Sequence, residues 1–239
     1  MPRNTYFQFK QFRIIQERSA MKVGMDGVLL GAWANASGAK RILDIGTGTG
    51  LIALMMAQKN HAAQIDTIEI EPEAFREAIE NTQQSPWNDR IHCEMISFQE
   101  FAEQTIWKYD LIVSNPPFFA NGLKTPLESR TKARHSDSLP LRVLVSGAAG
   151  LLSSNGRIAL ILPVEYLQEI QQLACSSQLY VSRLCRVKPN PQKPDFRILM
   201  ELTRIECFIK EENLMIEFEK HHDYTPEYKE LTKDFYLKF

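Results

Sequence analysis

From Arg41 onward, short apolar runs alternate with longer amphipathic stretches, and this alternation constrains the fold more than any other feature. The apolar runs predict strands at 41–45, 63–70, 90–96, 109–114 and 156–163. The stretches that follow them predict helices at 50–58, 71–84, 99–104, 141–152 and 164–176. Parallel strands need long crossovers, which helices supply. We therefore expect an α/β protein with a mostly parallel sheet and helices on both faces.

Both ends of the chain depart from this alternation. Strands expected at 179–187 and 197–206 have only "KPNPQKPDF" between them, so they should pair as a hairpin and add an antiparallel strand to the sheet. Residues 1–36 predict a short hairpin, with apolar positions from Phe7 to Ile14, followed by a helix at 25–36. We expect a single domain, 1–239, with its core at 37–206 and a C-terminal extension, 207–239, that packs on the surface as a strand and a helix.

Composition narrows the class of protein. The 239 residues are 44% apolar and 24% charged, which is typical of a globular protein. The formal net charge of −1 means that any nucleic-acid partner must be met by a local basic patch. The cysteines contain no CxxC pair, the N-terminus is too polar for a signal peptide, and no apolar run approaches membrane-spanning length. We expect a cytoplasmic protein with reduced thiols, no metal ion and no membrane partner.

The stretch "LDIGTGTG", 43–50, joins the first predicted strand of this alternation to its helix. Its glycines allow a tight turn and let a ligand approach the backbone, at the place where α/β sheets bind nucleotides. The dinucleotide pattern G-x-G-x-x-G fails because Leu51 occupies its sixth position, and the GK[ST] ending of a Walker A loop is missing. A tight turn without a ligand is the alternative interpretation.

An acid at the end of the next predicted strand indicates which nucleotide binds. Glu69 can accept both hydroxyls of a ribose, and no pyrophosphate needs to be neutralised, which favours S-adenosylmethionine. Asp44 would hold the ammonium of the methionine part, directly or through water, and Glu71 is a weaker ribose candidate. The cofactor residues predicted here are Asp44, Gly46, Thr47, Gly48, Gly50, Glu69 and Ile70.

The run "VSNPPFF", 113–119, ends a buried strand in a rigid corner, because neither proline can donate to a sheet ladder. Asn115 should lie beside Gly46 at the same sheet edge. Its side-chain oxygen and the Pro116 carbonyl can each accept one hydrogen of an exocyclic amine, which stabilises the charge that develops on alkylation. Phe118 can stack on the base. The predicted catalytic residues are Asn115, Pro116, Pro117 and Phe118; a rigid turn with a buried Phe is the alternative.

This corner matches the amino-methyltransferases of the class I fold, whose fourth strand ends in (Asn/Asp/Ser)-Pro-Pro-(Tyr/Phe). Members of that group act on adenine N6, cytosine N4, guanine N2 or protein glutamine. The motif therefore indicates the chemistry and leaves the substrate open.

Two further stretches, "AMKVGMDGVLLGAWA" (20–34) and "YTPEYKELTKDFYLKF" (224–239), resemble the bacterial tRNA1(Val) (adenine(37)-N6)-methyltransferase family. The resemblance implies a monomeric class I enzyme that methylates adenine N6 beside a tRNA anticodon. Met25 stands where that family usually has threonine, whereas Asp26 matches, and both are expected at the cofactor. Many class I enzymes bind the cofactor's adenine amine with an acid at the position of Ser97. Ser97 can accept one hydrogen bond there, and Phe98 either packs near the ring or packs between helices.

RNA binding must come from local charge, and two segments offer it. The loop after the proline corner carries Lys124, Arg130, Lys132 and Arg134, and is expected to grip phosphates; a solvated surface loop is the alternative. The turn with Lys188, Lys193 and Arg197 is a second candidate. Three other functions stay open: a guanine-N2 methyltransferase for ribosomal RNA, a protein-glutamine N5 methyltransferase, and a catalytically idle module that binds RNA or the cofactor.

Overall fold

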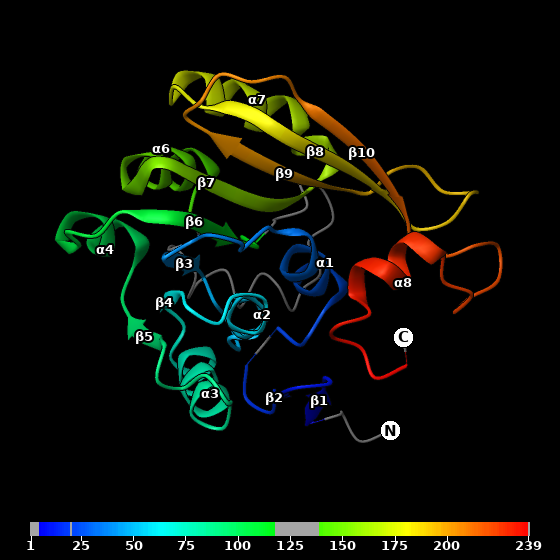
Figure 1. Ribbon diagram of the computed structural model, residues 1–239, viewed down its shortest axis with the longest axis horizontal. Coiled ribbons are helices and arrows are strands. Elements are labelled where there is room, and N and C mark those ends of the chain that lie inside the picture. Colours follow the sequence, from blue (N-terminus) through cyan, green and yellow to red (C-terminus); the bar gives the residue numbers. More distant parts are fainter. Residues whose placement is uncertain (1–4, 20, 118–138, 239) are drawn as a thin grey trace, which may run out of the picture.

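A central sheet of eight strands organises the computed structural model, which describes residues 5–19, 21–117 and 139–238 (Figure 1). The strand order is β10-β8-β9-β7-β6-β3-β4-β5. The strands are β3 (Arg41–Ile45), β4 (Gln64–Glu69), β5 (Ile91–Met95), β6 (Tyr109–Ser114), β7 (Leu152–Pro163), β8 (Tyr180–Lys188), β9 (Arg197–Thr203) and β10 (Lys210–Met215). Neighbours from β7 to β5 pair in parallel. The mostly parallel sheet is therefore confirmed.

The C-terminal hairpin is also confirmed, since β8 and β9 pair antiparallel. β9 lies between β7 and β8 and pairs antiparallel with β7 as well. The strand expected in the C-terminal extension is β10, which joins the sheet as its edge strand in parallel with β8. The extension therefore lengthens the sheet instead of only covering its surface.

Helices cover both faces of the sheet. The helices α1 (Met25–Trp33) and α2 (Leu51–Lys59) contribute to one buried apolar cluster. The helices α4 (Phe98–Gln104), α6 (Leu141–Leu151) and α7 (Leu167–Ser176) contribute to the other, and a short 3-10 turn at Val164–Tyr166 precedes α7. The helix α3 (Pro72–Gln83) packs against β4 and β5. The helix expected at 25–36 ends earlier, because Ala34 leaves the helical conformation.

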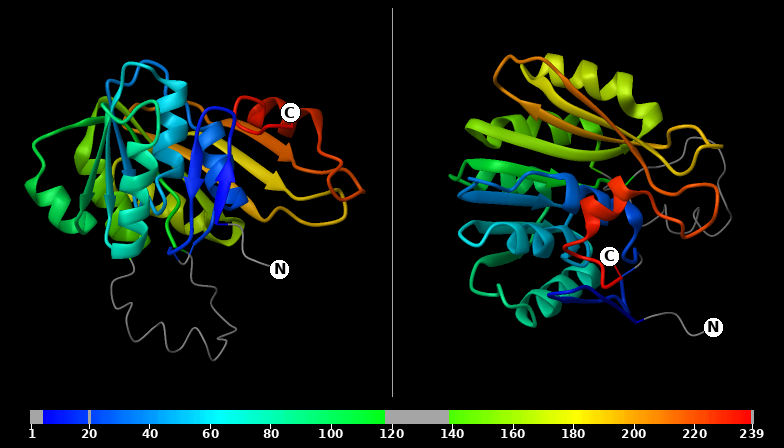
Figure 2. Two further views of the ribbon diagram at one scale, coloured as in Figure 1. Left: turned by 90° about the horizontal axis from the view of Figure 1, so that it is seen from below. Right: turned by 45° about the vertical axis from the view of Figure 1, so that its right-hand side comes forward.

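The two ends of the described chain pack against each other. The strands β1 (Tyr6–Gln8) and β2 (Arg13–Ile15) form the expected hairpin, with Phe9 and Phe12 stacked at 4.7 Å. The amide of Lys10 donates to the carbonyl of Phe235 at 2.8 Å. Helix α8 (Pro226–Thr232) packs against α1. Figure 2 shows the C-terminal segment, in red, beside α1, in blue. Among the described residues, no helix has the length and apolarity to cross a membrane.

Candidate functional site

The glycine loop between β3 and α2 is built on three left-handed residues. Gly46, Gly48 and Gly50 have φ values of 70°, 58° and 84°, a region that residues with a Cβ rarely adopt. The amides of Gly46 and Thr47 both donate to the carbonyl of Ile68 at 3.0 Å. The glycine loop is therefore hydrogen-bonded to the end of β4 and lies next to Glu69.

Asp44 lies fully buried beneath this loop. Its Oδ2 accepts hydrogen bonds from the Thr47 hydroxyl at 2.6 Å and the Ala53 amide at 3.2 Å. Its Oδ1 has no hydrogen-bond partner among the described residues. Burial, as the largest cause, raises the pKa of Asp44 to about 7. A buried carboxylate oxygen without a partner fits a site that receives a cationic group, so Asp44 fits the ammonium of S-adenosylmethionine.

Glu69 lies half-buried beside the glycine loop. Its Oε2 accepts the Gly48 amide at 2.8 Å, and its Oε1 accepts the amides of Ile70 and Glu71 at 2.8 and 2.9 Å. The carboxylate is thus fixed by three backbone amides, and its contact with a ribose stays a prediction. Ile70 beside it is 49% exposed. Glu71 instead caps α3, because its side chain accepts the Ala74 amide at 2.7 Å.

The proline corner lies level with the glycine loop. In the parallel pairing of β3 and β6, Ile45 is opposite Ser114, and the Ser114 hydroxyl donates to the Ile45 carbonyl at 2.8 Å. Asn115 and Gly46 therefore leave neighbouring strands at the same height, as the sequence predicted. Asn115 is half-buried, Pro116 is buried and Pro117 is exposed. Phe118 lies outside the described residues.

The first turn of α1 carries two predicted cofactor residues. Met25 is 41% exposed, and the carboxylate of Asp26 accepts a hydrogen bond from Nε of Arg197 at 2.9 Å. Arg197 was expected to contact RNA and Asp26 the cofactor, so the structure joins two residues that the sequence assigned to different ligands. Arg197 also places its guanidinium 5.0 Å from the centre of the Phe196 ring.

Ser97 and Phe98 begin helix α4. The Ser97 hydroxyl accepts the Glu100 amide at 3.2 Å and the Glu100 carboxylate accepts the Ser97 amide at 3.3 Å, which forms a capping box. The hydroxyl also donates to that carboxylate at 2.7 Å. Phe98 is 5% exposed and belongs to the apolar cluster of α4, α6 and α7. A Cβ added to Gly147 would lie 2.6 Å from its ring. These positions agree with the helix-packing alternative for Phe98, and the contacts of both residues with the cofactor stay predictions.

The predicted RNA-binding residues fall into two groups. Lys124, Arg130, Lys132 and Arg134 lie outside the described residues. Lys188 ends β8, and Lys193 follows in the turn that leads to β9. The pairings from β6 through β7 and β9 to β8 place that turn at the same edge of the sheet as Asn115.

A possible metal-ligand group lies after β10. Glu217, His221 and His222 place their ligand atoms within 4.8 Å of one another, and they are the one such group in the described part of the chain. The centres of the two imidazole rings lie 3.8 Å apart with the rings tilted by 30°, and Glu217 accepts the His222 amide at 3.0 Å. Ring contact and hydrogen bonding within a turn account for this arrangement, and the expected absence of a metal stays untested.

The sheet order, the glycine loop after β3 and the acid at the end of β4 define the class I methyltransferase fold. A predicted O-methyltransferase from Agrobacterium tumefaciens has this fold, with a TM-score of 0.67, 19% identity and coverage of 88% of this chain and 96% of that chain. The Pyrococcus horikoshii TYW2 in complex with MeSAdo matches with a TM-score of 0.56 and 11% identity, over 84% of this chain and 71% of that chain.

Sequence comparison identifies the family. The methyltransferase small domain family matches residues 26–169. Two relatives are named tRNA1(Val) (adenine(37)-N6)-methyltransferase. The one from Trichodesmium erythraeum is 48% identical to this chain over 98% of both chains. The one from Flavobacterium johnsoniae is 48% identical over 97% of this chain and 99% of that chain. The chain belongs to the tRNA1(Val) (adenine(37)-N6)-methyltransferase family.

Proposed function

We propose that this protein uses S-adenosylmethionine to methylate the N6 amine of adenine 37 in tRNA1(Val). The observation that carries the proposal is the common height of Gly46 and Asn115 at the sheet edge, set by the pairing of Ile45 with Ser114. The names of relatives that match nearly the whole chain support adenine as the target. Because tRNA is the substrate, we propose a cytoplasmic location.

The cofactor site rests on the residues around the glycine loop. Asp44 would receive the ammonium of S-adenosylmethionine at its unpartnered oxygen, and Glu69 would receive the ribose hydroxyls. Hydrogen bonds from the amides of Gly48, Ile70 and Glu71 hold the Glu69 carboxylate in place. When bound, the cofactor supplies an electrophilic methyl group. The left-handed glycines leave room for close approach, since nothing lies within 4 Å of a Cβ built on Gly46 or Gly48.

The substrate side of the reaction falls to the proline corner. The Asn115 side-chain oxygen and the Pro116 carbonyl each accept one hydrogen of the N6 amine. They favour a pyramidal nitrogen and stabilise the positive charge that develops on it. Pro116 and Pro117 keep the acceptors rigid, which preserves alignment with the methyl group. A general base is not required, because the proton leaves to water once nitrogen is alkylated. We assign base stacking to Phe118.

Phosphate contacts are proposed for both basic segments. Lys188 and Lys193 stand at the same edge of the sheet as Asn115. Lys124, Arg130, Lys132 and Arg134 follow the proline corner in the sequence. Arg197 takes a smaller part, because its guanidinium is paired with Asp26.

The test is methylation of in vitro transcribed tRNA1(Val), followed by nucleoside mass spectrometry. We expect N6-methyladenosine from the unaltered protein. We expect Asn115→Ala to keep most of its tRNA affinity and to lose turnover by about 100-fold or more, the scale of one lost transition-state acceptor. N6-methyladenosine as the product would exclude the guanine-N2 alternative, and unchanged turnover of Asn115→Ala would refute the role of Asn115. Absence of S-adenosylmethionine binding in calorimetry would remove every enzymatic function.

A further inference from the structure

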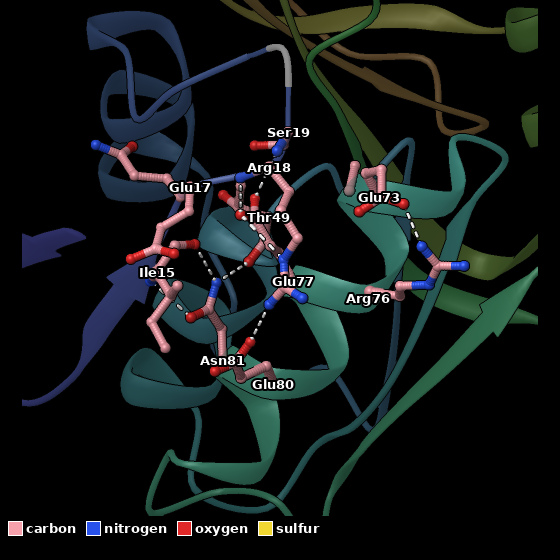
Figure 3. A network of polar contacts seen from close by, with 12 residues as sticks. Ile15, Glu17, Arg18, Ser19, Thr49, Glu73, Arg76, Glu77, Glu80 and Asn81 are labelled. Carbon is pink, nitrogen blue, oxygen red and sulfur yellow. Dashed lines mark hydrogen bonds and ion pairs between the residues drawn. The ribbon is translucent and has the colours of Figure 1, made fainter. Parts of the chain in front are cut away.

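The N-terminal segment 15–19 is held against α3 by two buried polar side chains (Figure 3). Glu77 is 0% exposed and Asn81 is 1% exposed, although both belong to an amphipathic helix whose other face meets solvent. Buried polar groups of this kind are costly unless every bond is made. The hydrogen-bond partners of Glu77 and Asn81 therefore show which other segments α3 binds.

Asn81 joins the segment to the glycine loop. Its Oδ1 accepts the Ile15 amide at 2.7 Å, and its Nδ2 donates to the carbonyls of Ile15 and Thr49, both at 2.9 Å. Thr49 stands between Gly48 and Gly50 in the loop assigned to the cofactor. One amide group thus connects the end of β2 with the backbone of that loop.

Glu77, one turn earlier on α3, holds the next part of the segment. Its Oε1 accepts the Arg18 amide at 2.5 Å and its Oε2 accepts the Ser19 amide at 3.0 Å. Burial acts to raise the pKa of Glu77, but these hydrogen bonds outweigh it and lower the pKa, so the carboxylate stays ionised. The Arg18 guanidinium lies 2.6 Å from the half-buried Glu80, and its Nε lies 4.0 Å from Glu77.

Hydrogen bonds between nearby residues also stabilise the chain just before α1. The Lys22 ammonium donates to the carbonyl of Ser19 at 2.9 Å and also to that of Gln16, while the Gln16 side chain accepts the Val23 amide at 2.6 Å. The first turn of α1 then meets the start of α2, where a Cβ on Gly27 would lie 2.9 Å from Leu51. Segment 15–19 is therefore held by α3, and the first turn of α1 lies against the start of α2.

We infer that Asn81 is a positioning residue for the cofactor, which it serves by holding segment 15–19 and the Thr49 carbonyl in one arrangement before binding. The inference rests on the proposed use of S-adenosylmethionine. A loop that is already ordered loses less conformational freedom when a ligand binds, so affinity should depend on this tie. Glu77 supports the same arrangement through the amides of Arg18 and Ser19.

The test compares Asn81→Asp with Glu80→Gln. The first variant keeps the size of the side chain and the acceptor for Ile15, but it cannot donate to Ile15 and Thr49. The second removes the charge of Glu80, which is the nearer of the two carboxylates that pair with Arg18. For Asn81→Asp we expect the Kd and KM for S-adenosylmethionine to rise about tenfold, equivalent to about 1.4 kcal/mol. We expect kcat at saturating cofactor to stay within about twofold, since Asn115 is untouched. Glu80→Gln should match the unaltered protein in both.

A second measurement uses the unaltered protein and does not depend on how the variant folds. Coupling is reciprocal, so S-adenosylmethionine should slow hydrogen exchange of the amides at 15–19 as well as those at 46–50. Slowing confined to 46–50, or an unchanged Kd in Asn81→Asp, would overturn the inference and leave the proposed function standing. If the unaltered protein does not bind S-adenosylmethionine, the proposed function and the inference fail together.

Discussion

Asp44 allows a quantitative test of the cofactor site, because its carboxyl group is fully buried and only one of its oxygens has partners among the described residues. Burial raises its pKa from 3.8 to about 7, against the opposing hydrogen bonds from Thr47 and Ala53, with a further increase from the charge of Glu69. An ionised Asp44 therefore destabilises the cofactor-free protein. The informative perturbation is Asp44→Asn, which keeps the shape of the side chain and an oxygen for Thr47 and Ala53.

The sign follows from proton linkage. A folded-state pKa above the unfolded value means that the folded protein binds the proton more tightly. The contribution of Asp44 to stability is therefore greatest below about pH 4 and is lost as pH rises to about 7. At about 1.4 kcal/mol per pKa unit, a shift from 3.8 to about 7 corresponds to about 4 kcal/mol. Asp44→Asn should gain stability over the unaltered protein by up to that amount as pH rises, and then level off.

The assay is urea denaturation of the cofactor-free protein between about pH 5 and pH 8. Asp110→Asn is the control of opposite sign. Burial acts to raise the pKa of Asp110, but hydrogen bonds from Ser153 and from the amides of Lys40 and Arg41 lower it. That variant should therefore be less stable than the unaltered protein by a constant amount across this pH range, because the unfolded pKa of about 4 lies below it. A stability difference for Asp44→Asn that is constant from about pH 5 to pH 8 would refute the argument from burial.

The cofactor reverses the expectation for the same variant. With S-adenosylmethionine present, an ionised Asp44 gains a cationic partner, so Asp44→Asn should bind the cofactor more weakly while its cofactor-free form is more stable. Calorimetry at about pH 8 measures this. Unchanged affinity would show that Asp44 does not receive the ammonium.

Three further substitutions test packing and backbone. Gly147→Ala places a Cβ 2.6 Å from the ring of Phe98, and should lower the free energy of unfolding by about 1–3 kcal/mol; equal stability would contradict the packing. Gly50→Ala forces alanine to a φ of 84°, which costs about 1–2 kcal/mol and should weaken cofactor binding in calorimetry. Tyr109→Phe removes a hydrogen bond of 2.8 Å to Asp66 and should cost about 1 kcal/mol in urea, and a change near zero would argue against that bond.

The sequence alone determined the features that depend on local periodicity and on backbone chemistry. The alternation after Arg41 predicts the parallel strands, and the glycines at 46, 48 and 50 mark positions where φ is positive. The cap of α4 also had a local signal, because Ser97 and Glu100 have capping-box spacing.

Only the tertiary structure decided the contacts between distant segments. The pairing of Asp26 with Arg197, the tie from Asn81 to Ile15 and Thr49, and the entry of β10 into the sheet have no local pattern. A polar residue on a helix looks solvent-exposed in the sequence until another element covers it. Hydrophobic periodicity fixes which elements form, because it follows from burial of one face. Which polar groups meet depends on how the elements pack. In this protein, the pairing of β3 with β6 brings the candidate cofactor and substrate residues together.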